Sequence, residues 1–457
     1  MTALRRLTFA LLAVALIVAT GVSASSGSGA DPSTTSASSM ASGNATALDP
    51  SAVLADASAV SDYVVGIRRE LHLTPELMWT ETATSAVVKR ELAAMGVAFE
   101  ELSSPGVLAT IGSGAPPVVL LRADMDALPL TEESDMPEDR RSRVPGKMHA
   151  CGHDGHTAML LGAARVLKSR ESTLRGTVHL AFQPAEEGGA GARRMLEDGL
   201  ADVRPPIETS FALHNWPYPE TPSGTVGTRA GTIMAGSGSF EIIVVGAGGH
   251  AAVPHKNVDV VVCASAAVMS LQTIVSRRVD PLDSAVVSVT VFKAGGSASN
   301  VMGDEAKLAG TFRALRKDTF EWLHGAIEQT ARDAAAAHGC TVRVDYAPES
   351  DGVTREEYPP TVNAPEAAAL ATSVATRVLG RGAARDVAPV MPAEDFSFFA
   401  ERWPSAMMWL GSHNETAGAT WPLHSTKYIL DESVLHLGVA MHVGYAEAFI
   451  AEGFPTA

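Results

Sequence analysis

Cysteine, aromatic residues and basic charge are all scarce in this sequence. Only three cysteines occur among 457 residues, and aromatic residues make up 5% of them. Three scattered cysteines are too few for the disulfide framework of a small secreted domain. Lysine and arginine total 35 against 51 aspartates and glutamates, so the net charge is -16 and the basic patch that nucleic-acid binding needs is missing. Small molecules are therefore the expected partners, and nucleic acid is not.

Long apolar runs are confined to the N-terminus. Residues 1–24 place Arg5 and Arg6 before an apolar run that ends in small residues, the layout of a secretory signal peptide with cleavage after Ala24. The alternative is an uncleaved anchor, but the run is short for a bilayer span of about 20 residues. No later stretch reads as transmembrane. We therefore expect a protein of the secretory pathway, extracellular or in an endomembrane lumen, without membrane contact after cleavage.

The rest of the chain divides into a leader and two folding patterns. Residues 25–53 form a predicted flexible leader because they are mostly Ser, Gly, Ala and Thr. Helix-like and strand-like segments alternate over residues 54–230 and again over 347–450, which predicts one α/β domain with a mostly parallel sheet flanked by helices. Residues 231–346 read instead as an α+β domain inserted into the first.

Residues 148–156, MHACGHDGH, are the densest group of candidate metal ligands. They contain three histidines, one cysteine and one aspartate, and they directly precede a predicted helix. Cys151 belongs to this group. The other two cysteines, Cys263 and Cys340, either pair in an oxidising compartment or stay as buried thiols, and the sequence leaves both readings open.

Further polar groups follow the predicted strands of the α/β domain. They are Asp124 and Asp126, Glu186 and Glu187, His214, and His424. Because ligands bind beyond the carboxyl ends of parallel strands, we expect these groups to converge with residues 148–156. Taken singly, an adjacent pair of glutamates or a histidine after a strand is more often solvated or hydrogen-bonded. Their joint placement favours a metal site.

The donor types indicate which metals would fit. Thiolate, imidazole and carboxylate together suit zinc, with manganese or cobalt as alternatives. The donors outnumber the needs of one tetrahedral ion, so we expect two ions that share a ligand, roughly 3.5 to 4 Å apart. Neighbouring side chains on an extended segment point in opposite directions, so one of Glu186 and Glu187 can bind metal while the other acts as general base.

Several of these segments resemble one enzyme family in order from Leu54 to Glu447. They read RADMDALPL, GKMHACGHDGHTAMLLGAARVL, FQPAEEGGAGARRMLEDG, GAGGHAAVPH, GTFRAL and AEDFSFF. The family is that of the amidohydrolases and metallopeptidases that include hippurate hydrolases, N-acyl-amino-acid amidohydrolases and plant hydrolases of indole-3-acetic acid amino acid conjugates. The resemblance implies a dinuclear-metal hydrolase domain that carries an inserted lid and dimerisation domain.

The resemblance implies five metal ligands for two divalent ions. Cys151 would bridge the ions, His153 and His214 would complete one site, and Glu187 and His424 the other. The resemblance leaves open which ion takes which ligand. Zinc and manganese are the expected metals, with cobalt and nickel as alternatives.

Glu186 is implied as the general base, and Asp126 as a carboxylate that orients a ligand. His149 and His156 receive no metal in this assignment, and we expect ordinary hydrogen bonds for both. Trp216 could line an acyl pocket, although an aromatic residue after a strand more often belongs to a core.

Three residues of the inserted domain are implied to meet the substrate. His250 would donate to the developing oxyanion from the partner subunit of a homodimer, while Asn300 and Arg313 would contact the substrate carboxylate. Read without the resemblance, His250 is a turn residue and Arg313 a surface charge. Gly303 stands where the family usually has proline, so the turn after Asn300 is less rigid than in the family.

The implied activity is metal-dependent hydrolysis of the amide bond of N-acyl amino acids, hippurate-like or indole-3-acetyl conjugates, to a carboxylic acid and an amino acid. One alternative is a dipeptidase or aminoacylase that uses the same chemistry. Another is a non-catalytic binder of metal or conjugate. The presence of every ligand position together with the base argues against the binder.

Overall fold

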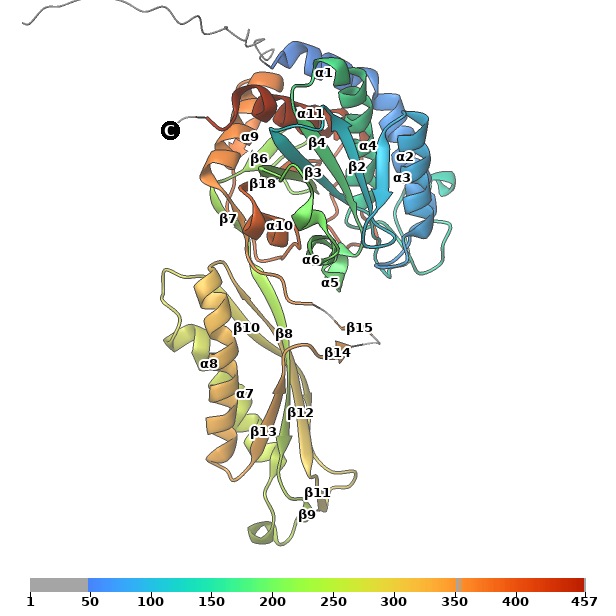
Figure 1. Cartoon of the computed structure of the whole chain (residues 1–457). Coiled ribbons are helices and arrows are strands. Elements are labelled where there is room, and N and C mark those ends of the chain that lie inside the picture. The colour runs from blue at the N-terminus through green and yellow to red at the C-terminus, as the bar shows by residue number, and fades with distance from the viewer. Residues whose placement is uncertain (1–47, 351–352, 355, 456–457) are drawn as a thin grey trace, which may run out of the picture. The chain divides into compact units, whose positions relative to one another are not determined.

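The computed structural model describes residues 48–350, 353–354 and 356–455, which belong to one compact unit of the chain (Figure 1). The predicted signal peptide, residues 1–24, lies outside the described residues, as does the predicted leader up to residue 47. The end of the predicted leader is helical instead, because helix α1 spans Pro50–Ala59. The Asp49 carboxylate caps this helix, and Val53 is buried in the core, so the fold starts before the predicted residue 54.

An eight-stranded sheet organises most of the chain, with the order β1-β2-β4-β3-β5-β18-β6-β17. Its central strands β4, β3, β5 and β18 are parallel to their neighbours within this group, as the alternating pattern predicted. The flanking pairs β1–β2, β2–β4 and β18–β6 are antiparallel. In chain order the strands are β1 Ala98–Glu101, β2 Val107–Gly112, β3 Val118–Asp124, β4 Thr177–Gln183, β5 Thr209–Trp216, β6 Val226–Thr228, β17 Ala384–Asp386 and β18 Ser405–Gly411.

Helices cover both faces of this large sheet. One core joins it to α1, α2 Ser61–Leu73, α3 Thr82–Ala94, α4 His153–Ser169, α9 Pro365–Val378 and α11 Leu435–Glu452. A second core on the other face includes residues of α6 Gly191–Glu197 and α10 Ser397–Arg402. Along β3, Val119 and Leu121 belong to the first core while Val118 and Leu120 belong to the second, as the two-residue period of a strand requires. Burial on both faces explains why β3 reads as one continuous apolar run.

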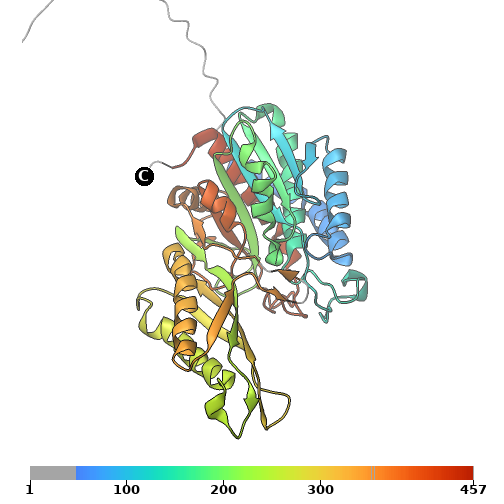
Figure 2. The ribbon, with the colours of Figure 1, turned by 60° about the horizontal axis from the view of Figure 1, so that its bottom comes forward.

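A four-stranded antiparallel sheet forms within residues 236–345, which we call the inserted segment. Its order is β10-β12-β8-β13, and α7 Val260–Arg277 and α8 Lys317–Ala336 pack on it around a separate core (Figure 2). The strands are β8 Gly236–Val245, β10 Ala285–Lys293, β12 Glu305–Ala314 and β13 Thr341–Asp345. Cys263 of α7 and Cys340 form a disulfide, which resolves the alternative that the sequence left open.

The inserted segment begins at β8 and not at the predicted residue 231. Strand β7, Gly231–Met234, pairs with β16, Thr361–Asn363, and Met234 packs in a core of the large sheet. The chain enters and leaves the insert side by side, because Ser237 and Tyr358 exchange backbone hydrogen bonds of 2.8 and 3.0 Å. The remaining short elements are α5 Glu186–Gly189, β9 Gly249–His250, β11 Val301–Met302, β14 Glu349–Ser350 and β15 Val353–Thr354.

Two helical stretches are long and apolar enough to cross a membrane by length and composition, whereas the sequence reading recognised none after the N-terminus. They are Val260–Arg277 and Glu432–Glu452, and 78% of the second is buried inside the protein, against 33% of the first. Core helices of soluble proteins pass the same test, so this is weak evidence for a membrane span.

Candidate metal centre

The predicted metal ligands lie at the carboxyl ends of the central parallel strands. His214 is in β5, Glu187 follows β4 in the short helix α5, and His424 lies in the loop that follows β18. Cys151 and His153 come from the loop and first turn of α4. The large sheet therefore brings together five side chains that are far apart in the sequence, as expected for ligands at such an edge.

These five residues form two groups of three that share Cys151. The ligand atoms of Cys151, His153 and His214 all lie within 4.8 Å of one another, and those of Cys151, Glu187 and His424 do so as well. Cys151 Sγ is 3.4 Å from His214 Nε2, and His424 Nε2 is 3.1 Å from a Glu187 carboxylate oxygen. The one thiol therefore lies where both groups can use it. His153 also groups with Glu186 and Glu187 and with Asp124 and His156, so the division of the ligands between two ions stays a prediction.

Unpartnered atoms at this position fit a bound metal. Among the described residues His153 Nε2 is buried without a hydrogen-bond partner, which is costly for a polar atom unless something else binds it. Its other ring nitrogen, Nδ1, is 3.3 Å from Asp126 Oδ1, and His214 Nδ1 is 2.7 Å from the Asn215 carbonyl oxygen. His214 therefore turns Nε2 toward Cys151, and the contact of Asp126 with Nδ1 leaves Nε2 of His153 free for a metal.

The His424 loop is held in a conformation that is unusual for a residue other than glycine. His424 has φ of 63°, in the left-handed region, and its backbone N–H donates to the Ala150 carbonyl at 2.9 Å. Such strain persists where surrounding contacts impose it, and it concentrates at functional sites. The bond to Ala150 fixes the loop beside Cys151.

The two unassigned histidines differ from each other. His156 is hydrogen-bonded as expected, with Nδ1 2.6 Å from Asp124 Oδ1 and Nε2 accepting from the Asn215 backbone at 2.9 Å. The expectation for His149 is wrong, since neither ring nitrogen has a hydrogen-bond partner among the described residues. Burial lowers the pKa of His149 to about 3, so this imidazole is neutral.

The predicted base, Glu186, is buried among other carboxylates. Burial raises its pKa, and the nearby Glu394 and Glu187 raise it further. Glu186 Oε1 accepts from the Asp395 backbone N–H at 3.3 Å. A raised pKa suits a group that must accept a proton and then release it.

A buried arginine balances this acidic group. Arg122 donates to Asp124 at 2.6 Å, to Glu394 at 2.8 Å and to Asp395 at 2.9 Å. Sequence reasoning did not assign Glu394 or Asp395 to the site. The only signal was two adjacent acids before an aromatic run, which taken alone also describes a surface turn.

A cavity of about 580 Å³ opens beside the metal ligands. Side chains of the large-sheet region and of the inserted segment both line it. The large-sheet region contributes Cys151, Glu186, Glu187, His214, Trp216, Tyr218, Leu423 and His424, and the inserted segment contributes Ser237, Ser239, Thr311 and Arg313. Trp216 is both core and cavity wall: it stacks on Trp409 with ring centroids 4.3 Å apart and is 5% exposed.

The cavity contains only one of the three residues predicted from the inserted segment. Arg313 lines it, burial lowers its pKa, and no carboxylate of the described residues lies within ion-pair distance of it. His250 and Asn300 are exposed and are not among the described residues that line the cavity. They lie next to each other, because β9 pairs with β11 and the Asn300 carbonyl accepts from Ala251 at 3.0 Å.

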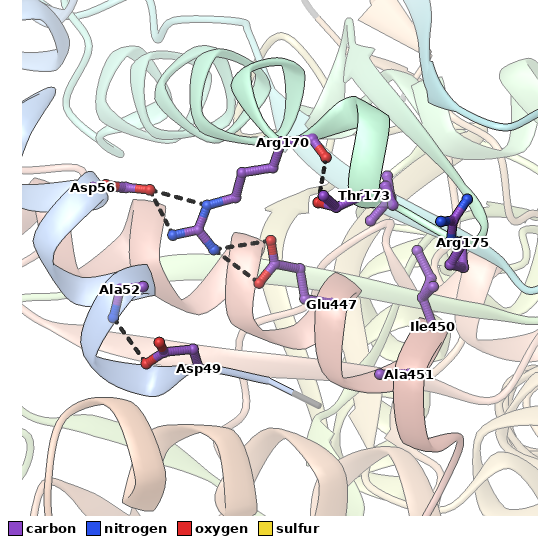
Figure 3. Close-up of a pocket in the computed structure, with 10 residues that line it drawn as sticks. Asp49, Ala52, Asp56, Arg170, Thr173, Arg175, Glu447, Ile450 and Ala451 are labelled. Atoms are coloured by element: carbon purple, nitrogen blue, oxygen red, sulfur yellow. Dashed lines mark hydrogen bonds and ion pairs between the residues drawn. The ribbon is translucent and has the colours of Figure 1, made fainter. Parts of the chain in front are cut away.

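A second pocket of about 360 Å³ lies where α1, the end of α4 and α11 meet (Figure 3). Arg170 occupies its centre and donates to Asp56 at 2.6 and 3.0 Å and to Glu447 at 3.0 Å. These charged groups already satisfy one another. Ion pairs between the helices therefore occupy the centre of this pocket.

Clustered metal donors, a neighbouring carboxylate and an adjoining cavity form the kind of site at which a metal-dependent hydrolase activates water. Residues 120–448 match the profile of Peptidase family M20/M25/M40, and the chain belongs to this family. The chain is 42% identical over 394 residues to IAA-amino acid hydrolase ILR1-like 2 of Arabidopsis thaliana, covering 86% of each chain. It is 35% identical over 376 residues to N-acetylcysteine deacetylase of Bacillus subtilis, covering 81% of this chain and 93% of that one.

A solved structure of the same family has the same fold. The chain aligns with the YxeP protein of Bacillus subtilis, a dinuclear metal binding peptidase from the M20 family, with a TM-score of 0.71 and 30% identity. The alignment covers 86% of this chain and 99% of that one. The predicted family, the α/β fold and the hydrolase class are thereby confirmed.

Proposed function

We propose that this protein is a dinuclear metal-dependent amidohydrolase that cleaves the amide bond of N-acyl amino acids, hippurate-like or indole-3-acetyl conjugates. The observation that carries the proposal is the sharing of Cys151 between two groups of donors, beside a cavity that also contains Glu186. The names of the relatives, an IAA-amino acid hydrolase and an N-acetylcysteine deacetylase, support the N-acyl amino acid as substrate class.

Cys151, His153 and His214 would hold one ion, and Cys151, Glu187 and His424 the other. When bound, two divalent ions supply a more acidic water and a polarised carbonyl. Glu186 takes the proton of the attacking water on its carboxylate and then delivers it to the leaving nitrogen. Asp126 keeps the His153 ring oriented throughout, and Zn²⁺ or Mn²⁺ is the proposed metal.

The two sides of the cavity suit the two ends of such a substrate. Arg313 offers a planar guanidinium that can grip the amino acid carboxylate with two hydrogen bonds. Ser237 and Ser239 lie on the same side and can donate to the same group. Trp216 and Leu423, from the large-sheet region, also line the cavity and offer apolar surface for the acyl group.

We propose a homodimer formed through the inserted segment, in which His250 and Asn300 complete the site of the partner subunit. Their exposure in a single chain supports this arrangement. Strand β10 is the outermost strand of its sheet, and Val286 and Phe292 on it are exposed. An exposed apolar edge strand favours pairing with another chain.

We place the protein in the secretory pathway, extracellular or lumenal. The basic and then apolar N-terminal residues support this location, and so does the pairing of Cys263 with Cys340. Disulfides persist mainly in oxidising compartments. Detection of the mature chain in the culture medium or a lumenal fraction of its host would test the location, and a chain confined to the cytosol would refute it.

Elemental analysis of the purified protein, combined with hydrolysis assays, tests the proposed function. The panel contains benzoyl-glycine, indole-3-acetyl-alanine, N-acetyl-cysteine and an unmodified dipeptide, before and after chelation. We expect about two metals per chain and hydrolysis of the acylated substrates that chelation abolishes and zinc or manganese restores. Preference for the dipeptide would indicate a dipeptidase, and bound metal without any hydrolysis would indicate a binder.

A further inference from the structure

The turn that carries the base and a metal ligand has an unusual backbone. Ala185 and Ala190, at its two ends, have φ of 57° and 52°, in the left-handed region that residues with a side chain seldom adopt. Gly188 between them has φ of 107°. Such a conformation persists only where the surroundings impose it, so the contacts of residues 185–190 show what holds Glu186 in place.

Two buried carboxyl groups hold the first three N–H groups of this turn. Asp126 accepts from the backbone N–H of Glu186 at 3.0 Å and of Glu187 at 2.9 Å. Glu81 is fully buried, and its Oε1 accepts from the Ala185 N–H at 2.7 Å. Burial and the neighbouring Asp126 raise the pKa of Glu81 to about 8.

A tyrosine holds the second half of the turn. The Tyr358 hydroxyl accepts from the N–H groups of Gly188 at 2.9 Å and Ala190 at 3.2 Å, and it donates to the Glu186 carbonyl at 2.5 Å. A phenolic oxygen has one proton to donate, and these three bonds use its donor and both of its acceptor positions. Tyr358 lines the cavity, yet its hydroxyl has no capacity left for a substrate.

We propose that Glu81 and Tyr358 are positioning residues for hydrolysis: together with Asp126 they fix the turn 185–190 so that the Glu186 carboxylate points into the cavity. The proposal rests on the proposed function because that function makes Glu186 the base. Neither residue touches the reacting atoms, so both act through the backbone of the turn.

Tyr358 also links the turn to the inserted segment. Its backbone pairs with Ser237 at the entrance of that segment, while its side chain binds the turn. A shift of strand β8 at Ser237 would therefore move the backbone of the turn 185–190, which includes Glu186. Glu356, two residues earlier, adds a backbone hydrogen bond to the Gly188 carbonyl at 3.1 Å. The position of the inserted segment and the geometry of Glu186 are therefore coupled at this crossing, and Tyr358 makes the side-chain contacts.

The chain offers closely matched control residues for the test. Glu76, five positions before Glu81, accepts from the N–H groups of Ala83 at 3.0 Å and Thr84 at 2.9 Å, so it supports helix α3 and not the turn. Tyr346 donates its hydroxyl to the His324 carbonyl within the inserted segment. Removing either group tests for general loss of stability.

The experiment compares Tyr358→Phe with Tyr346→Phe in the metal-loaded, full-length mature enzyme. Misplacement by about 1 Å can cost about 100-fold in rate, so we expect kcat of Tyr358→Phe to fall by about that factor while KM changes little. Metal content should stay at the wild-type value. Hydrogen exchange of peptides covering residues 185–190 should accelerate in Tyr358→Phe but not in Tyr346→Phe.

The Glu81 variants provide a second and independent test. Glu81→Gln keeps an acceptor for the Ala185 N–H, so it should retain kcat near the wild-type value, whereas Glu81→Ala should lose kcat and protection from exchange. Glu76→Ala should retain both. If Tyr358→Phe does not fold, the Glu81 and Glu76 variants still test whether side chains that bind the turn 185–190 position Glu186.

Wild-type kcat and wild-type exchange in both Tyr358→Phe and Glu81→Ala would overturn the proposal. Loss of metal in step with loss of activity would also overturn it, because the effect would then pass through Glu187. A wild-type enzyme that hydrolyses no substrate would refute the proposed function instead. The exchange measurements would still show whether these two side chains hold the turn.

Discussion

The predicted metal ligands and the predicted residues of the inserted segment have contrasting surroundings. The five ligands converge at one edge of the large sheet, where rigid strands and hydrogen bonds hold them. Of the three residues predicted in the inserted segment, only Arg313 is among the described residues that line the cavity. His250, on β9, and Asn300, directly before β11, are exposed. One chain therefore brings together all five predicted metal ligands and the predicted base, but only one of the three residues predicted to meet the substrate. Four substitutions test this contrast.

Cys151→Ala should have the largest effect, because this thiol belongs to both donor groups. Metal content should fall from about two ions per chain to nearly none, and hydrolysis should become undetectable. His424→Ala is the matched control, since it belongs to one group and should leave about one ion. Elemental analysis of the dialysed proteins makes the comparison. A Cys151→Ala protein that keeps two ions would show that the thiol is not shared.

Glu186→Ala should come second. Loss of a general base typically costs about 10²- to 10⁴-fold in turnover, and metal content should remain unchanged because the neighbouring Glu187 is the ligand. Steady-state kinetics with benzoyl-glycine and metal analysis together check this outcome. Full activity would remove Glu186 from the role of base.

His250→Ala tests whether His250 of the inserted segment acts on the site of the partner subunit. Alone it should lose about 10²- to 10³-fold in kcat, as expected for removal of an oxyanion donor. Refolding an equal mixture of His250→Ala and Glu186→Ala chains should restore about a quarter of wild-type activity, since half of the dimers are mixed and each has one intact site. No recovery in a mixture shown to contain mixed dimers would mean that His250 does not act across the interface.

Arg313→Ala should have the smallest effect of the four. Removing a charge-assisted hydrogen bond to the carboxylate should lower kcat/KM by about 10- to 100-fold, mainly through KM. For a substrate whose carboxylate is replaced by an amide, Arg313→Ala should change kcat/KM very little. Equal losses on both substrates would show that Arg313 does not read the carboxylate.

Much of this contrast could be predicted from the sequence because its signals are local. His214 and the pair Glu186 and Glu187 follow apolar strands, and the ends of parallel strands meet by topology. The predicted inserted segment was recognisable because its helix and strand pattern breaks the preceding alternation. Its start was placed at β7, since the pairing of β7 with β16 depends on a strand about 130 residues later.

The features that sequence reasoning missed depend on long-range contacts. Glu81 and Tyr358 reach the turn 185–190 from segments 104 and 172 residues away, and no spacing rule signals such hydrogen bonds. His149 shows the opposite error, since its place in a dense polar motif suggested hydrogen bonds, and its ring nitrogens find none among the residues that the structure describes. Polar residue type predicts a need for partners, but only packing determines which partners are present.

The neighbouring entry and exit of the inserted segment have a consequence for how such enzymes diverge. The chain crosses into this segment at Ser237 and returns at Tyr358, and these two positions are paired. A cassette joined at a single paired crossing can be exchanged by recombination with little disturbance of the host, as tolerated domain insertions commonly are. We therefore expect chimeras that swap this cassette to inherit a new substrate range while they keep the hydrolytic machinery, provided that the tyrosine at the crossing is retained.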